Sequence, residues 1–234
     1  MIKIITSPLF YIMLTLGLYY LFDYNYKKYK KIYFHPLVLT SSILIIYIYL
    51  ISLITSNNTT HVLEGYNSSL SIVNIMLGPL TVSLALPIYN NWKVFKENWL
   101  TIIIGTIVGC ITSILSTILL ANVFQLDNDV IKSLLPKSVT TAIAKEISIN
   151  INAIPEITIA SVIVTGLLGS LFGPMLSKRF RFDNYIINGM AFGSSSHAIG
   201  TSKAMELSKE AGAISSIAIV TSGILTMIIT LFIK

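Results

Sequence analysis

Long apolar runs separated by short polar segments dominate this chain. A helix needs about 20 apolar residues to cross the hydrocarbon core of a bilayer. Six of the runs contain such a segment, whereas the run at 184–202 mixes apolar with polar residues. The pattern therefore predicts an all-α polytopic membrane protein with about six full transmembrane helices. The uncharged runs cover residues 4–22, 32–63, 65–92, 98–126, 157–177, 184–202 and 211–233.

The third run contains residues that interrupt a helix. Its text "IMLGPLTVSLALP" places Gly78 before Pro79, and Pro87 follows. Proline lacks the backbone N–H that a helix interior needs, so we expect this span to be broken or kinked. Neighbouring segments can satisfy the freed backbone groups. The span is therefore either a wall of a cavity or simply a bent helix.

Basic residues gather in three of the loops between the apolar runs. Four lie at 27–31, two at 93–96 and three at 178–181, whereas the loops 55–71 and 122–130 have none. Cytoplasmic loops of membrane proteins are enriched in Lys and Arg. The distribution therefore predicts that the three basic loops are cytoplasmic and that the N-terminus lies outside.

Two segments, 131–150 and 184–209, mix apolar residues with Ser, Thr, Lys and Glu. With the loops oriented in this way, the first segment must begin and end outside, and the second must begin and end in the cytoplasm. We therefore expect two polar re-entrant segments that reach into the membrane and return. A broken helix that crosses the membrane fully is the alternative, and it would change the C-terminal topology.

The two polar segments resemble each other at an offset of 60 residues. "TAIAKEIS" (141–148) and "TSKAMELS" (201–208) are identical at four positions. If this is a repeat, its copies are inverted, because they enter from opposite sides. Inverted repeats with discontinuous helices are a recurring transporter architecture. A chance match between segments rich in Ser, Thr and Ala is the alternative.

Composition narrows the function classes. The chain is 54% hydrophobic and 11% charged, against about 25% charged residues in soluble domains. Its net charge of +6 comes from short clusters between apolar runs, which excludes nucleic acid as a partner and indicates a lipid bilayer. One cysteine and three scattered histidines offer no ligand spacing for a metal and no catalytic pair. We expect no cofactor and no enzymatic activity.

The polar segments offer chemistry suited to a small carboxylate. A hairpin tip rich in Ser and Thr presents hydroxyls and free backbone N–H groups, and a half-helix that starts there adds partial positive charge. Lys137 and Lys203 add full charges. Helix packing through Ser and Thr is the alternative use of each single hydroxyl. The cluster Ser194–Ser195–Ser196–His197 with Thr201 favours a binding site.

Two of these residues have two interpretations each. His197 could carry a coupled proton, because an unperturbed histidine titrates near neutral pH, or it could be bonded to a backbone carbonyl. Lys203 must pair, reach the interface or face water. It could pair with Glu206 or Glu146, or it could contact a substrate.

The chain resembles the LrgB/CidB family from about residue 70 to its end. The resemblance rests on "GPLTVSLALPIY", "LLPKSVTTAIAKEIS", "TGLLGSLFGP" and "GMAFGSSSHAIGTSKAMELSKEAGAISSIAIVTSGILT". It implies a plasma-membrane protein that works with a small LrgA/CidA-type partner. Family members are described as holin- or antiholin-like regulators of murein hydrolase activity and lysis, and relatives transport pyruvate, glycolate or glycerate. We therefore divide the chain into two N-terminal helices (1–65) and an LrgB-like core (66–234).

The resemblance also implies a set of substrate-binding residues. Ser202 departs from it, since the family often has Ala there, and Lys145 stands where an uncharged residue is expected. The first motif contributes Lys137, Ser138, Thr140 and Thr141, and the second contributes Ser195, His197, Gly200, Thr201 and Lys203, beside Ser196 of the serine cluster.

These observations favour a transporter subunit for small monocarboxylates. A holin- or antiholin-like regulator that oligomerises and permeabilises the membrane is the alternative, and a scaffold for the small partner is a third. Positioned Ser, Thr, Lys and His side chains favour transport, because a pore former needs only packing faces. Several GxxxG pairs, such as Gly105 and Gly109, predict close helix packing, and we expect a homo-oligomer.

Overall fold

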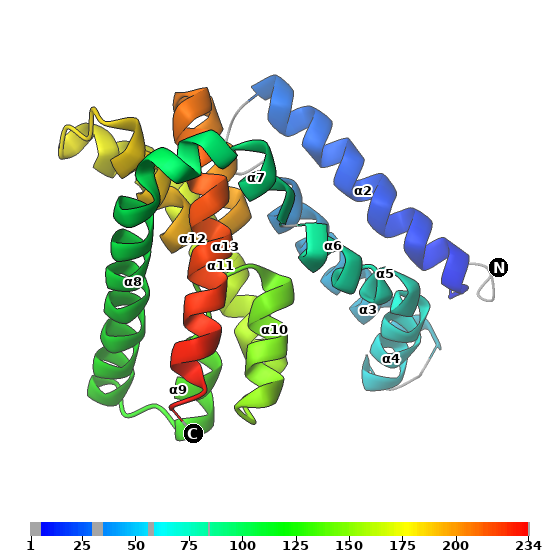
Figure 1. The fold of residues 1–234 in the computed structure, drawn as a ribbon. Helices are drawn as coiled ribbons and strands as arrows, with labels where there is room; N and C mark the ends of the chain where they lie inside the picture. Colours follow the sequence, from blue (N-terminus) through cyan, green and yellow to red (C-terminus); the bar gives the residue numbers. More distant parts are fainter. Residues whose placement is uncertain (1–5, 30–34, 56–58, 84, 234) are drawn as a thin grey trace. The chain divides into compact units, whose positions relative to one another are not determined.

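The computed structural model describes residues 6–29, 35–55, 59–83 and 85–233. Within these ranges the chain is all helical, without strands, as the sequence predicted. Contacts divide it into two compact units, Met1–Pro79 and Leu80–Lys234, which Figure 1 shows in colours that follow the sequence. Lys30 and Lys31 of the first basic loop and residues 56–58 of the next loop lie outside the described residues.

Four helices are long and apolar enough to cross a membrane. They are α3 (Pro36–Thr55), α8 (Trp92–Val123), α11 (Pro155–Arg179) and α13 (Lys209–Thr230). They confirm four of the predicted spans. The first predicted span is found as α2 (Pro8–Tyr29), which has 22 residues. It is less apolar than the other four because it contains several tyrosines and Asp23.

The third predicted span is not one continuous helix. It consists of four short helices, which are α4 (Thr59–Ser69), α5 (Ser71–Ile75), α6 (Leu77–Ser83) and α7 (Ala85–Asn90). Pro79 and Pro87 are each the third residue of a short helix. The first N–H groups of a helix have no partner within it, so proline costs little there. The prolines thus begin new helices rather than kink a long one.

An aromatic cluster joins the helices of the first unit. The ring of Tyr11 on α2 meets Tyr47 of α3 and Tyr66 of α4 edge to face, with centroids 6.3 and 5.5 Å apart. Edge-to-face contacts match the positive edge of one ring to the negative face of another. The hydroxyl of Tyr66 shares a hydrogen bond of 3.0 Å with Thr15 Oγ1. The cluster therefore packs apolar rings while its polar atom keeps a partner.

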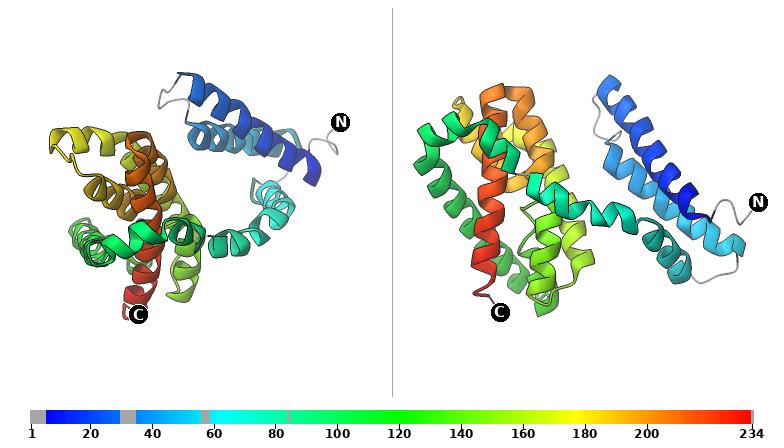
Figure 2. Two further views of the ribbon diagram at one scale, coloured as in Figure 1. Left: turned by 45° about the horizontal axis from the view of Figure 1, so that its top comes forward. Right: turned by 45° about the vertical axis from the view of Figure 1, so that its right-hand side comes forward.

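The second unit is built on α8 and α13, which run side by side in the same direction. Ile102 of α8 packs with Ile214 and Ile217 of α13, and further along Cys110 Sγ lies 3.6 Å from the Ser222 carbonyl. Figure 2 shows α13, in red, beside α8 from two directions. Three further elements pack on α11, namely α9 (Asn128–Leu134), α10 (Thr141–Asn150) and α12 (Tyr185–Leu207).

The segment 131–150 forms the first hairpin. After α8 the chain turns back along it, because Lys137 donates a hydrogen bond to Thr117 and Ser138 shares one of 2.8 Å with Ser113. It then reverses at 135–140, and α10 runs antiparallel to α11. Both ends of the segment therefore lie at the same end of the bundle, as predicted for a re-entrant hairpin.

The segment 184–209 forms the second hairpin, because α12 reverses its direction in the middle. His197 has φ 42° and ψ −138°, which no helix contains. A Cβ on Gly200 would lie 2.6 Å from the Phe192 carbonyl oxygen. Eight residues of straight helix span about 12 Å, so the arms 185–195 and 198–207 must fold back on each other. The second hairpin also returns to the end where it began.

Close contacts with α13 fix the second hairpin. A Cβ on Gly189 of the first arm would lie 2.6 Å from the Ala211 carbonyl oxygen, near the start of α13. Thr201 of the second arm shares a hydrogen bond of 2.7 Å with Ser215. The two arms therefore pack on the same stretch of α13, the first parallel and the second antiparallel to it.

A hairpin followed by a long helix thus occurs twice, with α11 and α13 running in opposite directions. The first arm of α12 runs antiparallel to α11, since Asn188 bonds to Ser177 and Ser196 lies against Gly169. The same arm runs parallel to α13. The offset of 60 residues does not align equivalent positions, because Thr141 begins α10 whereas Thr201 is the fourth residue of its arm.

Three helices end in the left-handed conformation without glycine. Each of these residues lets the next N–H bond back to a carbonyl five residues earlier, which satisfies a free group at the helix end. A non-glycine residue in this conformation costs free energy, so these turns are fixed by the elements that they join. The residues are Gln125 (φ 53°), Asn152 (φ 52°) and Arg181 (φ 54°), and the bonds are Leu126 N to Ala121 O (3.0 Å), Ala153 N to Ser148 O (2.9 Å) and Phe182 N to Ser177 O (2.9 Å).

We predict that Gly189→Ala destabilises the protein. Its Cβ would meet both the Ala211 carbonyl oxygen and the Ile214 Cβ at 2.6 Å, so α12 and α13 would have to separate. Overpacking of this kind costs about 1–3 kcal/mol, equivalent to roughly 3–10 °C in unfolding temperature. Tryptophan fluorescence during heating in detergent measures it. Gly17→Ala is the control, because nothing lies within 4 Å of its added Cβ, and equal unfolding temperatures would contradict the proposed packing.

Candidate functional site

The two hairpin tips reach the same level of α8 from opposite ends. We call residues 135–140 the first tip and residues 194–198 the second tip. Ser138 of the first tip is bonded to Ser113, and Ser194 of the second tip lies against Gly109, whose added Cβ would be 3.3 Å from its Oγ. Gly109 and Ser113 are one helical turn apart, or about 6 Å. The two polar tips therefore lie at nearly the same level along α8.

The first tip combines a positive charge with free hydrogen-bonding capacity. Lys137 is half-buried and donates to the Thr117 hydroxyl. The Oγ1 of Thr140 is buried and has no hydrogen-bond partner among the described residues. Thr140 precedes the first residue of α10, yet its side chain does not cap that helix. Thr141 follows it as a half-buried residue. The N-terminus of α10 carries partial positive charge and follows Lys137 by four residues along the chain.

The second tip is held by a strained histidine. The Nε2 of His197 lies 2.9 Å from the Val162 carbonyl oxygen of α11, and Nε2 must donate because a carbonyl only accepts. The His197 carbonyl accepts a hydrogen bond from Thr201 Oγ1 at 3.1 Å. Its backbone conformation costs about 1–3 kcal/mol and persists only where the surroundings impose it. The structure thus shows the second interpretation of His197, in which its ring is bonded to a backbone carbonyl.

Small residues of α11 make room for the second tip. A Cβ on Gly166 would lie 2.6 Å from His197 Cε1, and one on Gly169 would collide with the Ser196 hydroxyl. Ser196 is buried by this contact. The GxxxG-like face of α11 therefore serves packing within the chain, in agreement with the expected close approach of helices.

The remaining candidate residues are divided between packing and surface. Gly200 lies against the Phe192 carbonyl and allows the arms to pack. Ser195 is exposed and donates a hydrogen bond of 2.6 Å to the Ala191 carbonyl. Lys203 lies six residues beyond His197, about 9 Å along its arm, and forms an ion pair of 3.0 Å with Glu206. In the described part of the chain, no hydrogen bond joins the first tip to the second.

The partners of the tips on the long helices were missed from the sequence. Ser113 and Thr117 of α8 bond to the first tip. The Val162 carbonyl accepts from His197 of the second tip, and Ser215 of α13 bonds to Thr201, three residues beyond that tip. A signal for part of this set exists. Thr106, Cys110, Ser113 and Thr117 recur every three or four residues, which places them on one face of α8.

These features are those of a multi-pass membrane protein with two polar hairpin tips. The LrgB-like family model matches residues 15–234, so the chain belongs to that family. The YwbG protein of Bacillus subtilis is 38% identical over 86% of each chain. The holin-like protein CidB of Staphylococcus aureus is 35% identical over 95% of this chain and 94% of its own length. The chain is therefore a membrane protein of the same family as these holin-like relatives. No solved structure matches it.

We predict that cysteine pairs cross-link each tip to its helix. With Cys110→Ser as background, Ser113→Cys/Ser138→Cys and Thr201→Cys/Ser215→Cys replace hydroxyls that are 2.8 and 2.7 Å apart, close enough for a disulfide. After mild oxidation, both pairs should resist a maleimide-polyethylene glycol that shifts reduced protein on a gel.

The control pair for the first tip is Thr112→Cys/Ser138→Cys. Residue 112 is turned by about 100° around α8 relative to residue 113, so this pair should remain reactive. Equal protection of the control pair would contradict the position given to the first tip.

Proposed function

We propose that the protein is a subunit of a plasma-membrane transporter for small monocarboxylates such as pyruvate or glycolate, working with an LrgA/CidA-type small membrane protein. One observation carries the proposal, which is the meeting of two polar hairpin tips at one level of α8. Irregular backbone at membrane depth is tolerated only where it is buried in protein or lines a cavity. A site reached by hairpins from both ends is typical of transporters.

The first tip supplies the recognition of a carboxylate in this proposal. Lys137 provides the charge, the N-terminus of α10 provides backbone N–H groups, and the buried hydroxyl of Thr140 is available to a ligand. Hydrogen bonds between charged groups are about twice as strong as neutral ones. Ser138 lies bonded to α8 beside them and fixes where the tip stands.

The second tip closes the site from the other end. His197 fixes this tip against α11 through its bond to Val162, and we assign it a positioning role. Ser196 and Thr201 lie beside it, and Thr201 bonds to Ser215 of α13. Lys203 is paired with Glu206, so we place it at the edge of the proposed site rather than in its centre.

We predict that Lys137→Ala lowers monocarboxylate exchange by tenfold or more, because a charge-assisted hydrogen bond contributes about 1.5–3 kcal/mol. The measurement is counterflow of labelled pyruvate, glycolate and lactate in proteoliposomes, with and without the small partner. Lys132→Ala is the control, since Lys132 lies on α9 of the same hairpin outside the tip. Lys137→Arg keeps the charge and should retain part of the exchange.

A holin-like role is the second candidate, and the name of the CidB relatives favours it. A pore former would release a trapped neutral dye from the same proteoliposomes without saturable exchange. That result, with Lys137→Ala unchanged, would replace transport by permeabilisation as the function. Saturable exchange without dye release would support the transporter, and regulation of murein hydrolases and lysis would then follow from carboxylate flux.

We also propose that the N-terminus lies outside, as the basic loops indicate. In a Cys110→Ser background, Val123→Cys places a thiol at the exposed last residue of α8, and Phe180→Cys places one at the exposed residue that follows α11. We expect a membrane-impermeant maleimide to label residue 123 in intact cells and residue 180 only after permeabilisation. The reverse labelling would invert the orientation.

A further inference from the structure

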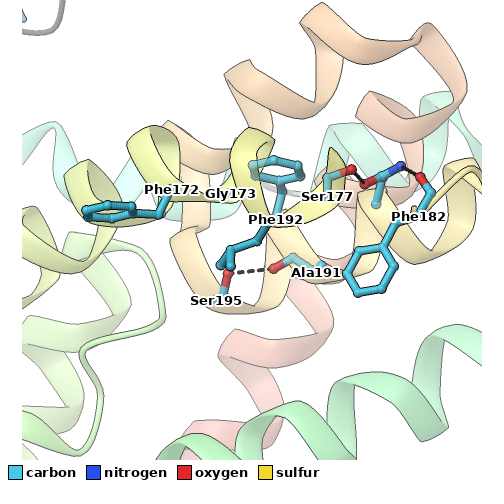
Figure 3. A pocket seen from close by; sticks show the side chains of 10 residues that line it. Phe172, Gly173, Ser177, Phe182, Ala191, Phe192 and Ser195 are labelled. Atoms are coloured by element: carbon cyan, nitrogen blue, oxygen red, sulfur yellow. Dashed lines mark hydrogen bonds between the residues drawn. The ribbon is translucent and has the colours of Figure 1, made fainter. Parts of the chain in front are cut away.

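An apolar groove runs along the outside of α11 between this helix and the first arm of α12. Phe172, Gly173, Phe182, Ala191 and Phe192 are labelled among its walls in Figure 3. It encloses about 160 Å³. Phe172 is 44% exposed and Ala191 is exposed as well, so the groove opens away from the core of the unit. Ser195 of the second tip lines one end of the groove, but the carboxylate contacts proposed above are made by other residues.

Hydrogen bonds fix the shape of the groove's mouth, which lies at the loop after α11. Ser177 donates a hydrogen bond of 2.6 Å to Oδ1 of Asn188. The amide of Asn188 donates one of 2.6 Å to the Phe182 carbonyl, and the dashed lines in Figure 3 mark both. Asn188 is buried, so its polar atoms are satisfied within the protein. This bridge joins α11, α12 and the loop, and it holds Phe182 at the mouth.

Basic residues lie in the chain segment at this mouth. Lys178, Arg179 and Arg181 are exposed and lie within the turn that separates the lining residues Ser177 and Phe182. Asp183 is the acidic residue of the same loop, so the loop carries a net charge of +2, three basic minus one acidic residue. The two ion pairs found among the described residues involve none of these side chains.

We propose that the groove binds an anionic phospholipid, with one acyl chain against the phenylalanines and the phosphate at the basic mouth. The groove follows α11 from Gly169 to Ser177, which are eight residues apart, or about 12 Å along the helix. One leaflet contributes about half of the 30 Å hydrocarbon core. The groove thus matches the depth of a single leaflet, and basic pockets between membrane helices are suited to anionic headgroups.

Other ligands fit this groove less well. A small carboxylate would lose its hydration among apolar walls without a buried partner. Inorganic phosphate needs only the charges, and exposed charges bind weakly in water. A lipid uses both the apolar walls and the basic mouth.

The experiment titrates the detergent-purified protein with phosphatidylglycerol and with phosphatidylcholine of the same acyl chains, followed by native mass spectrometry. We expect phosphatidylglycerol to bind at least tenfold more tightly. Arg179→Gln/Arg181→Gln should lower its affinity about tenfold or more, because each basic residue near the headgroup adds to the attraction. Lys93→Gln/Lys96→Gln removes equal charge from the exposed start of α8 and should have no effect.

A groove-filling variant tests the acyl chain. Ala191→Phe leaves the charges unchanged and should abolish the binding of both lipids, while the unfolding temperature without lipid stays the same. Equal affinities for the two lipids, or full binding to Ala191→Phe, would overturn the proposal. Displacement of the lipid by millimolar inorganic phosphate would reduce the site to a headgroup contact and would likewise overturn it. None of these outcomes depends on transport activity.

Discussion

Backbone groups that leave a helix inside a hydrocarbon layer must find new partners, and this chain does so twice. At the first tip, short local bonds such as Lys137 N to the Leu134 carbonyl (3.3 Å) and Val139 N to the Pro136 carbonyl (3.2 Å) close the turn. At the second tip, the His197 carbonyl accepts a hydrogen bond from the Thr201 hydroxyl. Unsatisfied groups of this kind cost several kcal/mol each in lipid. The arrangement of α8, α11 and α13 around the tips follows from this requirement.

The long helices meet that requirement by exposing small residues to the hairpins. Gly109 and Ser113 of α8 and Gly166 and Gly169 of α11 lie against tip residues. Larger side chains at the glycines would keep the tips away and leave their polar groups in lipid. The same faces that look like packing motifs in the sequence are therefore what allows polar chemistry in the middle of the protein.

Charge and hydropathy were enough to predict the four clear spans and the two hairpins. Each of these depends on properties summed over many residues. An interruption at Pro79 and Pro87 was predicted, but the division of residues 59–90 into four short helices was not. Whether a proline kinks a helix or begins a new one depends on its position within the turn, which hydropathy does not record. The break at His197 also lies inside an apparently helical pattern, and only contacts with α11 and α13 fix it.

Only part of the candidate site could be predicted from the sequence, because the rest depends on individual contacts. The polar residues of the tips were visible in the sequence because they interrupt apolar runs. Their partners, such as Thr117 and Ser215, sit within apolar helices, where a single hydroxyl has many uses. The ion pair of Lys203 with Glu206 was one of two interpretations, and local spacing did not decide between them.

The order of elements along the chain has a consequence for how the protein is made. Translation delivers α12 before α13, yet the first arm of α12 packs through Gly189 on Ala211 and Ile214. Inserting a segment with serines, a histidine and a reversed backbone into lipid alone costs free energy, because its polar groups lack partners there. The hairpin must therefore wait at the membrane surface until the last helix has been synthesised. Loss of α13 would remove a hairpin from the membrane as well as a span.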